Sequence, residues 1–103
     1  MPIEIGRVAL ESIPPGTMRK LARPPFNVLL VNVAGELFAI EDGCPHSGWS
    51  LSEGTLDGCV ITCRGHGWVI DVRTGAVVAP PVDEHNPSFR VEIEGSDAIV
   101  YED

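Results

Sequence analysis

The amino-acid sequence predicts an all-β domain built from antiparallel strands. No window keeps an apolar period of 3.6 residues over three turns, as an amphipathic helix would require. Short β-rich runs instead alternate with turn signals, and the chain contains 11 glycines and 9 prolines. Hydrophobic residues make up 44% of the 103 residues, which is enough for one folded domain with a modest core.

The N-terminal part of the chain predicts two strands joined by a turn. The run over 3–10 is rich in β-branched and apolar residues, and Ile13-Pro14-Pro15-Gly16 then breaks it. The polar run over 17–23 is typical of an edge strand, because an edge strand leaves one side to solvent.

The next run, 26–33, indicates a central strand. It is apolar on both faces at Leu29, Leu30 and Val31, as expected of a strand covered on both sides. Ala34-Gly35 predicts a hairpin turn into a strand over 36–40.

The middle of the chain predicts shorter strands. Residues 52–58 hold two glycines and indicate a turn-rich connection. A strand over 59–62 and its hairpin partner over 68–72 follow, and a turn at 73–75 leads into 76–79.

The C-terminal part predicts a final hairpin. Residues 80–87 indicate a loop, and apolar and charged residues then alternate from 89 to 94, the period of a half-buried strand. Gly95-Ser96 predicts the turn into a last strand over 97–102.

The charge is strongly acidic and unevenly distributed. Seven basic and fifteen acidic side chains give a net charge of −8. Residues 1–27 hold four basic and two acidic groups, net +2, whereas 28–103 hold three and thirteen, net −10. Nucleic acid and anionic membranes are therefore poor partners, and a protein with a basic face is a better one, although acidity alone also serves solubility.

The cellular location predicted from the sequence is the cytoplasm. The N-terminus lacks a basic segment followed by an apolar run, so no signal peptide is expected. The most apolar stretch, 28–40, is interrupted by Asn32, Gly35 and Glu36, so no membrane helix is expected. Three cysteines are an odd number, which suits a reducing compartment better than a disulfide scaffold.

Two short loops carry the candidate metal ligands. Cys44-Pro45-His46 and Cys63-Arg64-Gly65-His66 form the pattern C-x-H, sixteen residues, C-x-x-H. Each loop supplies one soft thiolate and one imidazole, the ligand types of a Rieske [2Fe–2S] centre. Nearby glycines let the backbone curl closely around a bound group.

Two other chemistries fit the same residues less well. A single zinc also accepts two thiolates and two imidazoles, but zinc sites more often pair like ligands, C-x₂₋₄-C and H-x₃₋₅-H. A catalytic Cys–His dyad would leave the second, nearly matching pair unexplained. Ligand order thus favours iron–sulfur over zinc, and either over a dyad.

The chain resembles the soluble Rieske ferredoxins that supply electrons to bacterial aromatic-ring dioxygenases. The resemblance covers nearly the whole chain and is best in ELFAIEDGCPH, LSEGTLDGCVITCRGHGW, DVRTG and the Pro80-Pro81 pair. It implies a Rieske iron–sulfur fold in a single domain, 1–103. A cluster-binding subdomain of about 41–81 would be inserted in an antiparallel β-sandwich base formed by 1–40 and 82–103.

The resemblance also implies a ligand assignment and a function. Cys44 and Cys63 would bind one iron of a single [2Fe–2S] cluster, and His46 and His66 the other. The stretch Ala79-Pro80-Pro81 would be a proline loop over the cluster, although an ordinary surface turn is the plainer interpretation. The protein would be a monomeric one-electron carrier, not itself an enzyme. It would pass electrons from a flavin- and NADH-dependent ferredoxin reductase to a terminal oxygenase that docks near the two histidines.

Two departures separate the chain from the Rieske proteins of cytochrome complexes. Those proteins carry an additional cysteine in each loop, where this chain has Trp49 and Gly65. They also carry hydroxyl donors near the cluster, where this chain has Gly67-Trp68. Fewer hydrogen bonds to the cluster sulfurs predict a potential near the low end of the Rieske range, about −150 mV.

Two alternative functions remain at this point. The chain also resembles, in size, the Rieske-like small subunit of assimilatory nitrite reductase, and it could be such a subunit. A zinc-bound structural or interaction module is the second alternative. Iron analysis separates the zinc module from the other two.

Other residues near the loops are expected to have plainer roles. Trp49 and Trp68 would either shield the cluster or cap the core. Cys59 is expected to be a buried small hydrophobe, His85 a solvated loop residue and Arg64 an ordinary surface arginine, although Arg64 could touch a partner.

Overall fold

A computed structural model describes residues 3–23, 26–43, 49–65 and 67–102. It consists of ten β-strands and two short 3-10 helices, with no α-helix in these ranges. The strands are β1 Ile3–Ala9, β2 Met18–Arg23, β3 Phe26–Val33, β4 Glu36–Glu41, β5 Thr55–Asp57, β6 Val60–Thr62, β7 Val69–Asp71, β8 Val77–Ala79, β9 Ser88–Glu94 and β10 Asp97–Glu102. The 3-10 helices are η1 Leu10–Ser12 and η2 Leu51–Glu53. The prediction of an all-β fold is confirmed.

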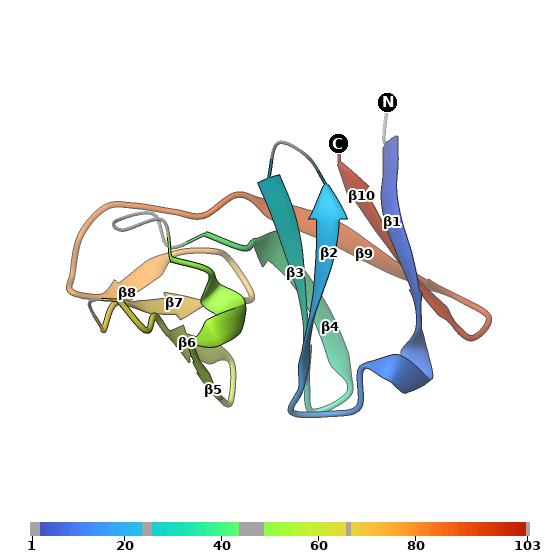
Figure 1. Cartoon of the computed structure of the whole chain (residues 1–103), viewed down its shortest axis with the longest axis horizontal. Helices are drawn as coiled ribbons and strands as arrows, with labels where there is room; N and C mark the ends of the chain where they lie inside the picture. Colours follow the sequence, from blue (N-terminus) through green and yellow to red (C-terminus); the bar gives the residue numbers. More distant parts are fainter. Residues whose placement is uncertain (1–2, 24–25, 44–48, 66, 103) are drawn as a thin grey trace.

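The strands form two antiparallel sheets. The larger has six strands in the order β1-β10-β9-β4-β3-β2, and the smaller has four in the order β5-β6-β7-β8. Figure 1 shows the small sheet at one end of the molecule and both chain termini on the six-stranded sheet. Among the described residues, no helix is long and apolar enough to cross a membrane.

The six-stranded sheet curls so that its two edge strands approach each other. A Cβ on Gly6 in β1 would lie 2.8 Å from Cδ1 of Leu21 in β2, so the missing side chain lets the two edges come together. The predicted edge position of the 17–23 strand is confirmed, since β2 is the last strand in the order.

Strand β3 is buried on both faces, as its sequence predicts. Its alternate side chains belong to two apolar clusters: Leu29 and Val31 pack into the cluster shared with the small sheet, and Val28 and Leu30 into the cluster within the curled sheet. All four side chains are at most 1% exposed. Burying each side chain contributes roughly 1.5–3 kcal/mol to stability. Because its two faces lie in different clusters, β3 joins the two halves of the core.

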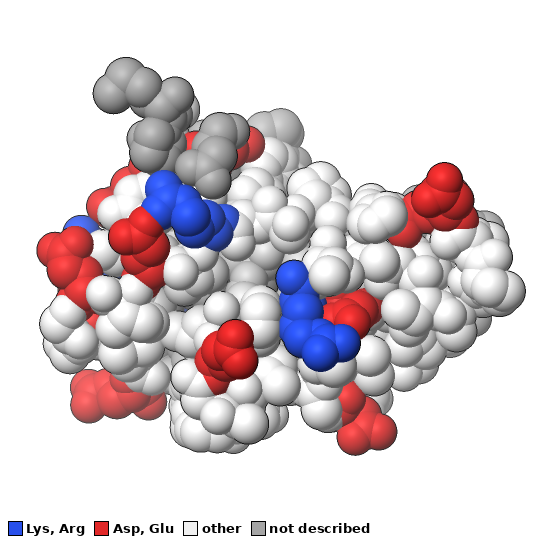
Figure 2. All heavy atoms as spheres, turned by 180° about the vertical axis from the view of Figure 1, so that it is seen from behind, with Lys and Arg blue, Asp and Glu red and all other residues white. Residues whose placement is uncertain are grey.

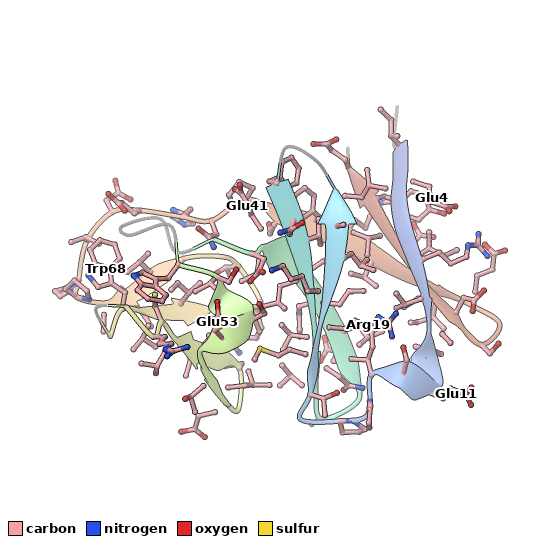
Figure 3. All side chains as sticks on the ribbon, in the orientation of Figure 1. Glu4, Glu11, Arg19, Glu41, Glu53 and Trp68 are labelled. Atoms are coloured by element: carbon pink, nitrogen blue, oxygen red, sulfur yellow. The ribbon has the colours of Figure 1, made fainter. Side chains whose placement is uncertain are left out.

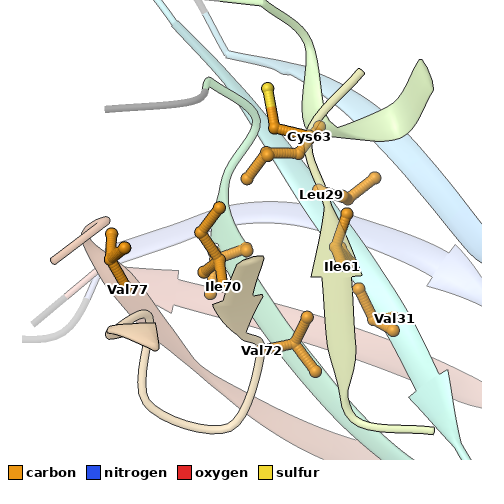
Figure 4. Close-up of a cluster of buried hydrophobic side chains, with 9 residues drawn as sticks. Leu29, Val31, Ile61, Cys63, Ile70, Val72 and Val77 are labelled. Carbon is orange, nitrogen blue, oxygen red and sulfur yellow. The ribbon is translucent and has the colours of Figure 1, made fainter. Parts of the chain in front are cut away.

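The cluster between the sheets supports the small sheet. Figure 4 shows Ile61, Ile70 and Val72 of the small-sheet region facing Leu29 and Val31 of β3. The complete buried set is Leu29, Val31, Ile40, Leu51, Ile61, Cys63, Ile70, Val72 and Val77. Because these residues come from both sheets, the small sheet is fixed on the large one.

Two local predictions were wrong. Residues 52–58 were expected to be a turn-rich connection, but η2 and β5 occupy most of this stretch, and β5 pairs with β6 through Leu56 and Ile61. A strand of three residues is too short to show a period. The predicted first strand is confirmed, but it ends at Ala9, one residue earlier than expected, because η1 begins at Leu10. Ile93 was expected to be half-buried but is 55% exposed, because β4 pairs with β9 only at Ser88 and Phe89.

Candidate metal centre

The second metal loop lies in the hairpin between β6 and β7. Cys63 follows β6 directly, and its backbone N–H donates to the carbonyl of Trp68 at 2.7 Å. The N–H of Gly67 donates to the carbonyl of Cys63 at 3.1 Å, and Gly67 has a φ of +71°, which favours glycine. The two hydrogen bonds close the base of the hairpin, so the backbone position of Cys63 is fixed.

The side chain of Cys63 lies at the edge of the apolar cluster between the sheets. Cys63 is 1% exposed. Figure 4 shows its sulfur pointing away from Val31 and Val72, out of the cluster. Cysteine sulfur is a preferred ligand of soft metals and iron–sulfur clusters, so a cysteine at the end of a hairpin, with its sulfur directed away from the apolar packing, suits such a group. The residue present at this position therefore fits the predicted cofactor.

The other three predicted ligands, Cys44, His46 and His66, lie outside the described residues. Within the described ranges, no group of three or more His, Cys, Asp and Glu side chains is placed to hold a metal ion. The structure thus locates one predicted ligand and the strands that lead to it, and the four-residue ligand set stays a prediction.

A buried carboxylate lies just before the first metal loop. The side chain of Asp42 is 0% exposed. It accepts hydrogen bonds from the backbone N–H of Ser52 at 2.7 Å and from the Ser52 hydroxyl at 3.1 Å. Its other partner is the ammonium group of Lys20 in β2, 3.6 Å away. The carboxylate therefore joins the residue before the loop to the 3-10 helix after it.

A buried amide contacts the same short segment from another side. Nδ2 of Asn86 donates to the carbonyl of Glu41 at 3.0 Å and to the carbonyl of Gly43 at 2.8 Å. Asn86 is 4% exposed, and its backbone N–H donates to the carbonyl of Gly75 at 2.7 Å. Both donors of its amide are used, so the side chain is held in one orientation.

Asp42 and Asn86 were not predicted as site residues. Asn86 is separated from Glu41 and Gly43 by more than forty positions, and no local pattern predicts such a contact. The one available signal was the position of Asp42, two residues before the predicted ligand Cys44.

Comparison with known proteins decides the family. The Rieske [2Fe–2S] domain family matches residues 7–102. The chain belongs to this family. The predicted Rieske fold and the single Rieske-type [2Fe–2S] cluster are thereby confirmed.

The relatives of this Rieske protein are dioxygenase ferredoxins. It is 41% identical over 93 residues to the biphenyl dioxygenase ferredoxin subunit of Pseudomonas sp. (strain KKS102), covering 89% of this chain and 85% of the relative. It is 41% identical over 86 residues to the biphenyl 2,3-dioxygenase ferredoxin component of Rhodococcus jostii (strain RHA1), covering 84% and 80%. A chain in the solved complex of reduced oxygenase and oxidised ferredoxin of carbazole 1,9a-dioxygenase matches with a TM-score of 0.86 and 34% identity. That match covers 96% of this chain and 91% of the solved one.

These relatives confirm the predicted class. They are named as ferredoxin components, that is, as electron carriers and not as catalytic subunits. This favours a dioxygenase-type Rieske ferredoxin over a nitrite reductase subunit, and the family match excludes a zinc module as the main interpretation.

Three side chains form a surface group beside the second metal loop of this Rieske ferredoxin. The guanidinium carbon of Arg64 lies 5.8 Å from the centroid of the Trp49 ring, and Nη1 of Arg64 is 3.2 Å from Oε1 of Glu53. Trp49 is 45% exposed, so it does not cap the core. Arg64 is held between an aromatic ring and a carboxylate at the surface.

The other residues singled out in the sequence either pack against the core or lie at the surface. Trp68 is half-buried and packs against the cluster between the sheets, as does Cys59. His85 is exposed, and its backbone forms a bridge with Ala76. Figure 3 places Trp68 and Glu53 at the small-sheet end, away from Glu4 and Glu11.

Most of the described basic side chains are paired with an acidic one. Figure 2 shows basic side chains lying next to acidic ones on the face opposite to that of Figure 1. Arg73 contacts Asp71 at 2.8 Å, and its side-chain hydrogen bond is the largest cause of a lowered pKa of Asp71. Arg90 pairs with Glu92 and lies over the ring of Tyr101. The excess acidic groups keep the overall field negative.

Proposed function

We propose that this Rieske ferredoxin carries single electrons from a flavin- and NADH-dependent ferredoxin reductase to the terminal oxygenase of an aromatic-ring dioxygenase. The observation that supports this most directly is the match over nearly the whole length to a chain from a ferredoxin–oxygenase complex. The 41% identity to biphenyl dioxygenase ferredoxins supports the same class of partner.

Four residues are proposed to hold the cluster. Cys44 and Cys63 would bind one iron, and His46 and His66 the other. When bound, the cluster supplies a centre that accepts and releases one electron without a change of protein ligands. We further propose that residues 41–81 form the cluster-binding subdomain, with the remaining strands as its base.

The protein around Cys63 is suited to holding this ligand still. The hydrogen bonds at 2.7 and 3.1 Å between Cys63, Gly67 and Trp68 fix the hairpin backbone. Ile61 and Ile70, both 0% exposed, pack beneath it. A dry, rigid support limits the rearrangement that accompanies a change of charge, which favours rapid electron transfer.

The charge distribution supports a protein partner with a basic docking face. Residues 28–103 carry a net charge of −10, and this part includes both metal loops. A partner that docks near His46 and His66 would therefore be attracted at low ionic strength. The three cysteines suit a reducing compartment, and on that ground we propose a cytoplasmic location. We further propose that the carrier is a monomer.

Reconstitution of a dioxygenase tests the proposal. The purified holoprotein would replace the ferredoxin component in a mixture of the biphenyl dioxygenase reductase and oxygenase with NADH and biphenyl. We expect product formation well above the mixture without ferredoxin, and a decrease in rate as salt is added. If the protein supports no turnover above that blank with either the biphenyl or the carbazole system, the proposal is contradicted.

A further inference from the structure

The first metal loop is preceded by a three-residue segment, Glu41 to Gly43, that is held from two sides by buried polar side chains. We propose that Asp42 and Asn86, together called the loop anchor, are positioning residues that fix where this loop starts and ends. The inference rests on the proposed cluster and deepens it: the loop anchor would control how long and in what geometry the cluster is retained.

The Asn86 half of the loop anchor fixes the path of the backbone. One amide group binds the carbonyl of Glu41 at 3.0 Å and that of Gly43 at 2.8 Å. The segment is also tied by its own N–H groups, from Glu41 to the carbonyl of Pro87 at 2.9 Å and from Asp42 to the carbonyl of Asn27 at 2.8 Å. Cys44 follows Gly43 directly, so this network sets the direction in which the chain reaches a predicted ligand.

The Asp42 half joins the two ends of the loop. The carboxylate lies before the loop, and its two bonds to Ser52, at 2.7 and 3.1 Å, reach the residue after Leu51. Leu51 is 0% exposed and belongs to the cluster that also contains Cys63. The Asp42 carboxylate thus links the two ends of the first metal loop. Through Leu51, it also links them to the apolar cluster that supports the second metal loop.

The burial of these groups makes their bonds costly to lose. Asp42 has a side chain that is 0% exposed, and Asn86 is 4% exposed. Removing one partner leaves buried donors or acceptors unsatisfied, which costs more than the net value of the bond. The backbone of segment 41–43 then becomes more mobile next to Cys44. Strands β3, β4 and β9 keep the hydrogen bonds that pair them.

The chain provides a matched control in Asn32. This residue is also a buried asparagine, 7% exposed, and its side chain donates to the carbonyl of Ile13 at 2.7 Å and accepts from the N–H of Gly35 at 2.7 Å. It pairs with Leu37, four residues before Glu41 in β4, or about 13 Å along the strand. Asn32→Ala should destabilise the fold without touching the first loop.

The experiment compares Asn86→Ala and Asn32→Ala in the holoprotein. We would measure the rate of iron release to a ferrous chelator under reducing, anaerobic conditions at a temperature where far-ultraviolet circular dichroism shows both variants folded. Visible-region circular dichroism, which reports the asymmetry of the cluster surroundings, is the second measurement. We expect Asn86→Ala to release iron about tenfold faster than wild type and to change the visible spectrum. Asn32→Ala should lower the melting temperature and leave both cluster measurements unchanged.

Asp42→Asn gives an independent variant that keeps the shape of the side chain, and it decides the question should Asn86→Ala not fold. We expect faster iron release here too, because the amide carries no negative charge to attract the Lys20 ammonium and has one acceptor oxygen where the buried carboxylate has two. Iron release and visible spectra equal to those of Asn32→Ala in the folded loop-anchor variants would overturn the inference. A wild-type protein that binds no iron would instead contradict the proposed function.

Discussion

The backbone N–H of Cys63 donates to the carbonyl of Trp68 at 2.7 Å, across the base of the second metal loop. This bond joins Cys63, the one predicted ligand among the described residues, which directly follows β6, to Trp68, which directly precedes β7. The loop is therefore a short hairpin that projects from a small sheet packed on a buried apolar cluster. The ligand position depends on strand pairing as much as on the residues of the motif itself.

Replacing Cys63 tests the ligand assignment against the other cysteine of the same region. Cys63→Ser should abolish the visible absorption bands and the bound iron, because a hydroxyl is a poor substitute for a thiolate. Cys44→Ser and His66→Ala should do the same. Cys59→Ser is the control: Cys59 is half-buried against the apolar cluster and should keep the native spectrum. Native absorption in Cys63→Ser would show the assignment to be wrong.

Truncating Ile70 tests the support beneath the metal loops. Ile70 is 0% exposed and pairs with Ile61 across β6 and β7. Ile70→Ala should lower the free energy of unfolding by about 2–5 kcal/mol, because it leaves a cavity in a packed core. Ile93→Ala, at a side chain that is 55% exposed, should change it by less than about 0.5 kcal/mol. Chemical denaturation measures both values, and an equal loss of unfolding free energy in the two variants would contradict the described packing.

The fold could be predicted from the sequence where a pattern is long enough to have a period. The run Leu29, Leu30, Val31 predicted a strand buried on both faces because its own residues carry that information. Strand β5 was missed because three residues, Thr55 to Asp57, show no alternation, and its pairing partner lies outside it. The exposure of Ile93 was missed for a related reason, since burial depends on how far β4 extends alongside β9.

The candidate site likewise contains residues that a local sequence pattern predicts and residues whose role only the fold reveals. Cys63 could be predicted as a ligand because a metal ligand pattern is local in sequence and specific in residue type, and this assignment stays a prediction. Asp42 and Asn86 could not, because their role depends on contacts with Ser52 and with backbone carbonyls brought close only by the fold. Hydrogen bonds to backbone atoms leave no pattern in a single sequence.

Gly75 is a position where the backbone permits no side chain. Its φ is +81°, and a Cβ there would overlap the carbonyl oxygen of Asn86. Gly75→Ala should cost about 2–5 kcal/mol of stability, from the unfavourable φ together with the overlap. Gly58 has a φ of +62° with open space around it, so Gly58→Ala should cost only about 1–2 kcal/mol. Thermal unfolding of Gly75→Ala and Gly58→Ala separates the cost of the positive φ from the cost of the overlap. Equal losses of stability in the two variants would contradict the close approach of Gly75 to Asn86.

The Asp71–Arg73 pair predicts a pH-dependent contribution to stability. The hydrogen bond from Arg73 lowers the pKa of Asp71 below its usual value of 3.8. A lowered pKa in the folded state stabilises the protein above the unfolded pKa, and this stabilisation is lost as the pH falls through the folded value. Arg73→Ala should therefore lower the melting temperature by a few degrees at most at pH 7, because the arginine is exposed, and the difference should shrink as the pH falls below 3.8 and through the lowered pKa of Asp71.

Arg19→Ala is the control for this prediction, since Arg19 is an exposed arginine on the edge strand β2. Arg19→Ala should leave the fall of the melting temperature at acid pH the same as in wild type. A melting-temperature difference for Arg73→Ala that persists undiminished at pH 2 would argue against the carboxylate as its cause.

An anaerobic redox titration of the purified wild-type protein, followed by visible absorption, tests the central claim most directly. We expect uptake of one electron per chain by a coloured protein, with a midpoint potential near the low end of the Rieske range, about −150 mV. A protein that stays colourless after anaerobic reconstitution with iron and sulfide, and takes up no electron, would contradict it.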